Sequence, residues 1–159
     1  MVARMDDTAE LRQATATDAY AIRDLTRQAY AKWVPIIGRE PKPMTADYVE
    51  ALQKHRFDLL YTTGKLAALI ETIPEIDHLL IENLAVSPLF QRRGFGKKLL
   101  GHAEHVVSIL GPSEIRLYTN KLFAENLQFY AALGYRSDRE EEFKGGFLIH
   151  MSKPVGEAL

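Results

Sequence analysis

The stretch QRRGFGKK, residues 91–98, combines two glycines with four basic side chains. It follows the apolar run LLIENLAVSP and precedes LLGHAEHVVSIL, whose apolar residues recur at helical spacing. The first N–H groups of a helix lack partners within the helix and carry a partial positive charge, so they attract anions. Glycines let a phosphate approach the backbone closely. These residues are consistent with a pyrophosphate site, but on their own they favour a tight strand-to-helix turn with solvated basic residues, because short glycine motifs occur often by chance.

Spacing separates this stretch from two other phosphate-binding motifs. A Walker loop would need glycine at 91 and Ser or Thr at 98, where the chain has Gln91 and Lys98. A Rossmann fingerprint starting at Gly94 would need a small residue at 99, where the chain has Leu99. Neither motif describes the sequence.

The composition bounds the class of protein. The chain has 159 residues, 47% of them apolar, and a formal net charge of −1, which predicts one domain over residues 1–159 and argues against a nucleic-acid partner. Neither a signal peptide nor an apolar run of membrane-spanning length is evident, so we expect a cytoplasmic protein with no membrane partner. The absence of cysteine excludes a cysteine nucleophile, and the histidines lack ligand spacing, so no metal is expected.

Periodicity and turn residues predict the element order β, α, α, β, β, β, α, β, α, β, β. A strand–helix–strand unit at 78–120 should be parallel and the remaining strands largely antiparallel. The expected fold class is α/β (α+β), with a mixed, mostly antiparallel central sheet flanked by helices on both faces. The expected strands are 9–15, two within 57–73 joined at Thr63-Gly64, 77–87, 114–120 and two around Gly145-Gly146; the expected helices are 17–33, 45–55 (capped by Thr45), 95–110 and 121–133, with a loop at 35–44.

Three segments together resemble the GNAT superfamily of acetyl-CoA-dependent N-acetyltransferases. LAVSPLFQRRGFGKKLL resembles the acetyl-CoA loop of that family, with its pattern Gln/Arg-x-x-Gly-x-Gly/Ala after a strand. TNKLFAENLQFYAALGY resembles the later strand–helix segment, which ends in Tyr-x-x-x-Gly-aromatic, and FLIHMSKP resembles the last strand. The resemblance covers roughly residues 78–155 and implies the GNAT (acyl-CoA N-acyltransferase) fold with acetyl-CoA as cosubstrate.

The resemblance also implies how acetyl-CoA is held. The backbone from Gln91 to Gly96 would wrap the pyrophosphate, with Arg92 and Lys97 as the main side-chain helpers. The strand edge before the loop would hydrogen-bond the pantetheine arm, and an asparagine on the later helix would contact CoA; Asn120, at the preceding strand end, is the alternative amide. The expected cofactor-binding residues are Leu84, Ala85, Val86, Gln91, Arg92, Arg93, Gly94, Phe95, Gly96, Lys97 and Asn126.

Two residues are candidates for the acyl-transfer chemistry. Tyr130 matches the family tyrosine that donates a proton to the leaving thiolate, and core packing is its alternative role. Glu82 lies between Ile81 and Leu84, where partial desolvation would make its carboxylate a stronger base; a solvated sheet-edge glutamate is the alternative. Without a cysteine, the amine should attack acetyl-CoA directly in a ternary complex.

The acceptor site is expected in the first half of the chain. Tyr30, Trp33 and Asn83 could contact the acceptor or could pack in the core. We expect a small-molecule or peptide amine as acceptor and a possible homodimer, with no nucleic-acid or membrane partner. The alternative function is a non-catalytic module of the same fold that binds or senses acyl-CoA.

Overall fold

The computed structural model describes residues 9–156, which form two compact units. Unit 1 contains the residues up to Thr72 together with Asn83–Leu99, and unit 2 contains Ile73–Glu82 and the residues from Leu100 on. Strands β3 (Lys65–Pro74) and β4 (Leu79–Val86) and helix α5 (Phe95–Leu110) each contribute residues to both units.

Seven strands are hydrogen-bonded in the order β1-β2-β3-β4-β5-β7-β6. The β4–β5 pair is parallel, whereas β1–β2, β2–β3, β5–β7 and β6–β7 are antiparallel. The predicted α/β class with a mixed, mostly antiparallel sheet is confirmed. The elements are β1 (Ala9–Gln13), η2 (Ala16–Asp18), α1 (Ala19–Tyr30), η3 (Ala31–Trp33), α2 (Val34–Ile37), α3 (Lys42–Thr45), α4 (Tyr48–Lys54), β2 (Arg56–Thr62), β3 (Lys65–Pro74), β4 (Leu79–Val86), η4 (Pro88–Phe90), α5 (Phe95–Leu110), β5 (Glu114–Asn120), α6 (Ala124–Ala132), β6 (Arg136–Phe143) and β7 (Gly146–Pro154).

The segment expected as a loop at 35–44 instead contains two short helices, α2 and α3. Proline is tolerated there because it stands in the first turn of each helix, where its missing N–H would have no partner in any case. The expected cap at Thr45 is also wrong. Asp47 caps α4, because its Oδ1 accepts the backbone N–H of Glu50 at 3.1 Å.

The helix expected at 121–133 begins later, at Ala124. A turn precedes it, in which the backbone carbonyl of Asn120 accepts the N–H of Phe123 and the Asn120 side chain accepts the N–H of Leu122. The first strand is also two residues shorter than expected, ending at Gln13.

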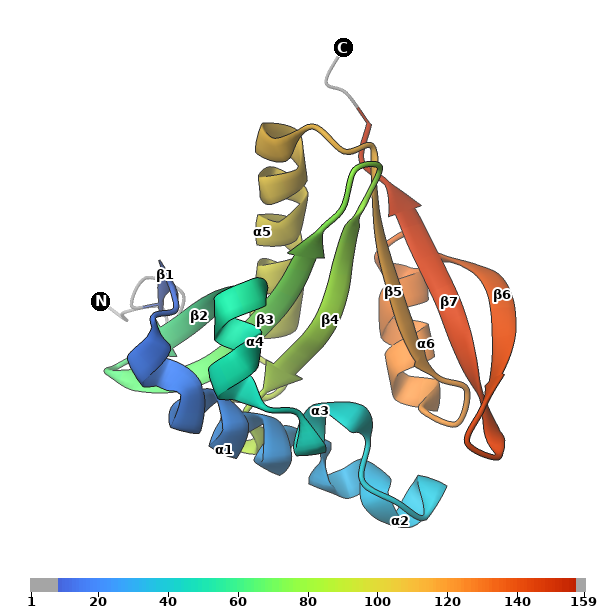
Figure 1. Cartoon of the computed structure of the whole chain (residues 1–159), viewed down its shortest axis with the longest axis horizontal. Coiled ribbons are helices and arrows are strands. Elements are labelled where there is room, and N and C mark those ends of the chain that lie inside the picture. Colours follow the sequence, from blue (N-terminus) through green and yellow to red (C-terminus); the bar gives the residue numbers. More distant parts are fainter. Residues whose placement is uncertain (1–8, 157–159) are drawn as a thin grey trace, which may run out of the picture. The chain divides into compact units, whose positions relative to one another are not determined.

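Unit 1 is built around an apolar cluster on one face of β2 and β3. Helices α1 and α4 lie over that face (Figure 1), and α1 buries residues at a spacing of three and four, as an amphipathic helix does. The Tyr48 and Phe57 rings meet edge-to-face at 5.9 Å. The cluster consists of Ala19, Ile22, Leu25, Ala29, Tyr48, Phe57, Leu59, Leu69 and Ala85.

Unit 2 has a sheet with two chemically different faces. Along β5, the buried residues Ile115 and Leu117 alternate with the polar residues Arg116 and Tyr118, as period-two side-chain alternation requires. Lys153 of β7 reaches Glu104 of α5 at 3.0 Å, which places α5 on the same face as the buried residues. No helix within residues 9–156 is long and apolar enough to cross a membrane.

A buried carboxylate joins β1 to the start of α1. The guanidinium of Arg12 donates to both oxygens of Asp18, at 3.1 and 2.9 Å, and the backbone N–H of Thr15 donates to Oδ2 at 2.7 Å. The hydrogen bonds from Arg12 are the main cause of the lowered pKa of Asp18, and the bond from Thr15 adds to it.

We expect Asp18→Asn to lower the free energy of unfolding by about 1–3 kcal/mol at neutral pH, because it removes charge-assisted hydrogen bonds to a buried group. A carboxyl whose pKa is lowered by folding stabilises the folded state above its unfolded pKa, and this contribution disappears as pH falls through the folded pKa. The difference between wild type and variant should therefore shrink below about pH 4, as measured by urea unfolding across pH.

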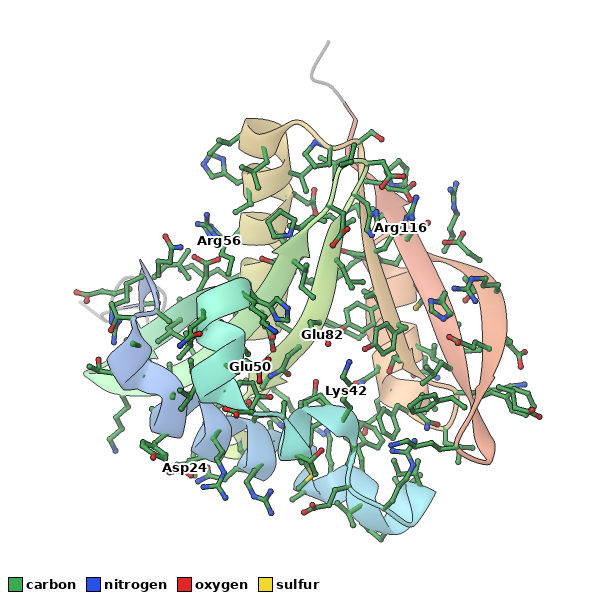
Figure 2. All side chains as sticks on the ribbon, in the orientation of Figure 1. Asp24, Lys42, Glu50, Arg56, Glu82 and Arg116 are labelled. Carbon is green, nitrogen blue, oxygen red and sulfur yellow. The ribbon has the colours of Figure 1, made fainter. Side chains whose placement is uncertain are left out.

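Asp24→Asn, at an exposed position on α1 (Figure 2), is the matched control and should change stability by less than about 0.5 kcal/mol. Equal losses for the two variants, or a difference that does not shrink as pH falls, would contradict the assigned role of Asp18.

Candidate active-site elements

The chain between β4 and α5 contains an unusual left-handed residue. Within residues 9–156, three residues other than glycine have positive φ: Thr63, Arg92 and Lys144. Thr63 and Lys144 each precede a glycine in a two-residue hairpin turn, where positive φ at both positions is typical. Arg92, with φ of 66°, lies outside any hairpin. Its conformation costs about 1–2 kcal/mol, and strain of this kind concentrates at functional sites.

The same turn delivers the backbone into α5. Gly94 has φ of 80°, and a Cβ added there would meet nothing within 4 Å. The first helical hydrogen bond runs from the N–H of Lys98 to the carbonyl of Gly94 at 3.0 Å. The N–H groups of Phe95, Gly96 and Lys97 therefore belong to the first turn, which offers donors to an external acceptor.

Aromatic packing fixes the start of α5. Phe95 is buried and lies 6.3 Å from the Phe90 ring, over which the Arg93 guanidinium sits at 5.3 Å. Because its ring is buried, Phe95 is placed to offer a ligand its backbone rather than its side chain. The exposed basic side chains around this turn are Arg92, Arg93, Lys97 and Lys98.

The predicted pantetheine-binding strand edge leads directly into the loop. Leu84 and Val86 are half-buried and Ala85 is buried. The amide Nε2 of Gln91 donates to the carbonyl of Val86 at 3.4 Å, which ties the loop back to the end of β4. These residues and the loop all belong to unit 1.

Asn83 is the centre of a buried hydrogen-bond network in unit 1. Its side chain is 2% exposed; Nδ2 donates to Thr26 Oγ1 and to the Tyr48 hydroxyl, both at 3.2 Å. The Tyr30 hydroxyl donates to Asn83 Oδ1 at 2.9 Å. Tyr48 in turn donates to the carbonyl of Pro43 at 2.6 Å. Asn83 thus links α1, α4 and the α3 segment to β4.

Tyr30 and Trp33, the other two predicted acceptor-site residues, differ in their surroundings. Tyr30 is half-buried, and its hydroxyl also lies 3.4 Å from the carbonyl of Leu84. Trp33 is buried, with the Lys32 ammonium 4.9 Å from its ring centroid. Tyr30 is therefore the more accessible of the two.

Glu82, the predicted base, belongs to unit 2 and is marked on β4 in Figure 2. It is half-buried, and its Oε1 accepts a hydrogen bond from the Tyr118 hydroxyl at 3.0 Å. Sequence reasoning did not single out Tyr118. The available signal was the alternation along EIRLYTN, which places Tyr118 on the polar face. Parallel pairing of Ile81 with Leu117 then puts Tyr118 beside Glu82.

Tyr130, the predicted proton donor, is 8% exposed near the end of α6. Its ring packs edge-to-face against Phe129 at 5.3 Å and against Tyr135 at 5.6 Å. Burial raises the pKa of the Tyr130 hydroxyl, so the phenol keeps its proton at neutral pH and is available as a donor. The buried Tyr135 hydroxyl has no hydrogen-bond partner among the described residues.

The two candidate asparagines have different settings. The Asn120 side chain accepts the N–H of Leu122 at 2.9 Å, so it is engaged in the turn before α6. Asn126 is half-buried within α6. In the described part of the chain, no group of three or more His, Cys, Asp or Glu side chains is arranged to hold a metal ion.

The fold and these elements define the class of protein. Residues 53–137 match the family model of the acetyltransferase (GNAT) domain. The chain therefore belongs to the GNAT acetyltransferase family and is an acyltransferase. A comparison with curated proteins found no match.

Solved structures share the fold at low sequence identity. One is the ribosomal-protein-S18-alanine N-acetyltransferase from Escherichia coli, with a TM-score of 0.77, 22% identity, and coverage of 94% of this chain and 96% of that chain. Another is the PaiA N-acetyltransferase from Thermoplasma acidophilum in complex with coenzyme A, with a TM-score of 0.76, 19% identity, and coverage of 92% and 98%. A third is a GNAT family acetyltransferase from Elizabethkingia anophelis with acetyl-CoA bound, with a TM-score of 0.69, 17% identity, and coverage of 93% and 99%.

Proposed function

We propose that the protein is an N-acetyltransferase that moves the acetyl group of acetyl-CoA to a primary amine by direct attack. The observation that carries this proposal is the strained, basic turn at Arg92 and Gly94 opening α5, in a chain of the GNAT family. Two solved structures of the same fold contain CoA or acetyl-CoA, which supports acetyl-CoA as cosubstrate.

The turn supplies what a pyrophosphate needs. The N-terminus of a helix carries about half a positive charge, and its first N–H groups can donate to phosphate oxygens. Gly94 and Gly96 leave the backbone accessible, while Arg92 and Lys97 add full positive charges. Arg93 is a weaker candidate for direct contact, because its guanidinium lies over the Phe90 ring.

The pantetheine arm would follow β4. Pairing of β4 with β5 covers Leu79–Ile81, and Leu84–Val86 follow later in the strand. Backbone groups of Leu84–Val86 would hydrogen-bond the amides of pantetheine, as a sheet edge binds an added strand. Asn126 is the proposed side-chain contact to CoA, because the Asn120 side chain already accepts a backbone N–H.

The proposed reaction joins an amine nitrogen to the thioester carbonyl carbon. The nitrogen lone pair forms the C–N bond, and the carbonyl oxygen carries the negative charge of the tetrahedral intermediate. Collapse of the intermediate breaks the C–S bond. Glu82, directly or through water, takes a proton from the amine, and Tyr130 gives its proton to the departing sulfur. The products are the N-acetyl amine and the free thiol of CoA.

An amine acceptor is consistent with a neighbour in fold that is named as an alanine N-acetyltransferase of ribosomal protein S18. For this chain, we propose that Tyr30 contacts the acceptor, because it is more accessible than Trp33. Trp33 would support the acceptor site through packing. Asn83, whose amide is held by Thr26 and Tyr48, would act by orienting Tyr30.

Gly94→Glu should abolish or strongly weaken acetyl-CoA binding measured by isothermal titration. Two like unit charges about 6 Å apart cost about 3 kcal/mol at an effective dielectric constant of about 20, which corresponds to roughly 100-fold in affinity before screening by salt. Circular dichroism would confirm that the variant is folded.

Gly64→Glu is the matched control. Gly64 has φ of 79°, against 80° at Gly94, and a Cβ at either position meets nothing within 4 Å. Both variants therefore introduce the same strain and the same charge, at different places. Equal loss of binding in the two variants, or full binding by Gly94→Glu, would contradict the pyrophosphate site.

Tyr130→Phe should lower kcat by about 100-fold or more, a typical effect of losing a general acid. The KM for acetyl-CoA should change little, because the hydroxyl acts on the sulfur only as charge develops in the transition state. Release of CoA thiol with a primary-amine acceptor, found by screening amino acids, polyamines and peptides, provides the measurement.

Tyr135→Phe removes a hydroxyl from the ring that packs against Tyr130, and that hydroxyl has no partner in the described structure. This control should keep wild-type kcat and should not lower the melting temperature. A folded Tyr130→Phe protein with wild-type kcat would exclude the proposed donor.

A further inference from the structure

Four side chains form a row across the polar face of unit 2. They come from four strands that are adjacent in the sheet, in the order β4, β5, β7, β6. Tyr118 of β5 is the register partner of His150 of β7. The parallel pairing of Ile81 with Leu117 places Glu82 beside Tyr118 on the same face. The fourth member is Glu141 of β6, which lies two residues beyond Arg139, the register partner of His150.

Each member of the row contacts the next. The Tyr118 hydroxyl donates to Glu82 Oε1 at 3.0 Å. The Tyr118 and His150 rings lie 5.7 Å apart at an interplanar angle of 38°. The Nε2 of His150 donates to Glu141 Oε1 at 2.7 Å. Glu82, Tyr118 and His150 are half-buried, so the inner part of the row is partly shielded from water, whereas Glu141 is exposed.

The neighbouring row on this face is different. It contains Arg116 and Arg136, both register partners of Ser152. Each arginine pairs with a carboxylate two positions along its own strand, Arg116 with Glu114 and Arg136 with Asp138, and the Arg116 guanidinium also lies 3.6 Å from Oδ2 of Asp77. Those are local surface ion pairs, which contribute little to stability or geometry. The contacts of the Tyr118 row instead cross from strand to strand and end on Glu82.

We propose that Tyr118 is a positioning residue for Glu82, and that His150, held by Glu141, fixes the Tyr118 ring. This inference rests on the proposed function, in which Glu82 takes the amine proton. A glutamate side chain has several rotatable bonds, and a base acts efficiently only when its oxygen is held within reach of the proton. The phenol binds one carboxylate oxygen, and the histidine ring, which lies against the phenol and is hydrogen-bonded to Glu141, limits the movement of the phenol.

Tyr118→Phe keeps the ring and removes only the hydroxyl. We expect kcat/KM for the amine to fall about tenfold, since a hydrogen bond to a charged group is typically worth that factor or more. The KM for acetyl-CoA and the melting temperature should stay close to wild type. When Glu82 is already replaced by Gln, Tyr118→Phe should change kcat/KM for the amine by no more than about twofold. The effects of two substitutions do not add when the two groups act as a unit.

Tyr20→Phe, at an exposed tyrosine of α1, is the matched control for loss of a hydroxyl and should behave as wild type. His150→Phe keeps an aromatic ring against Tyr118 but removes the bond to Glu141. We expect it to lower kcat/KM for the amine by a smaller factor than Tyr118→Phe, again only when Glu82 is present.

A second readout needs no acceptor. The carboxyl ¹³C resonance of Glu82, assigned as the signal lost in Glu82→Gln, should move in Tyr118→Phe and stay in place in Tyr20→Phe. An unmoved resonance, or losses of activity by Tyr118→Phe and Glu82→Gln that simply multiply, would overturn the positioning role. Failure of the proposed function would give another pattern of results. The wild-type protein would acetylate no amine in the panel, but the Glu82 resonance would still move in Tyr118→Phe.

Discussion

The left-handed turn at Arg92 and Gly94 is the constraint on which the rest of unit 1 depends. The chain passes from β4 into α5 through a backbone conformation at Arg92 that L-residues adopt only at a cost. Burial of Phe95 and the bond from Gln91 to Val86 hold the two sides of the turn and offset that cost. The hydrogen bonds of Asn83 hold the strand that precedes the turn, because they fix β4 against α1 and α4. A turn that binds an anion must hold its donors in fixed positions, and a rigid strand before it and a rigid helix start after it provide that.

Unit 2 presents two acid–base groups in contrasting surroundings. Tyr130 is packed among aromatic rings, and the burial that raises its pKa keeps the phenol neutral and able to donate. Glu82 lies on the polar face, where it accepts a hydrogen bond from Tyr118. The proposed proton donor and the proposed base thus differ both in residue type and in environment.

The sequence predicted the features that depend on local pattern and missed those that depend on distant partners. Helix α5 has both of its predicted ends, because Gly94 and Gly111 terminate the periodic run between them. The helices at Val34–Ile37 and Lys42–Thr45 escaped detection, since proline and glycine suggest a loop even where a proline occupies a first helical turn. The Asn83 network joins residues 35 to 57 positions apart, which no local pattern reveals. The Glu82–Tyr118 bond depends on the register of β4 against β5, which alternation along β5 does not supply. The catalytic and cofactor-binding roles stay predictions.

The central claim is that the mouth of α5 binds the pyrophosphate of acetyl-CoA. The most direct measurement is a pair of calorimetric titrations of the wild-type protein, one with S-acetylpantetheine and one with S-acetylpantetheine 4′-diphosphate, which share the thioester and the amide arm and differ only in the pyrophosphate. Two charge-assisted hydrogen bonds to the pyrophosphate would together contribute about 3 kcal/mol or more, so the account predicts that the diphosphate binds at least roughly 100-fold more tightly. Equal affinities for the two compounds would contradict it.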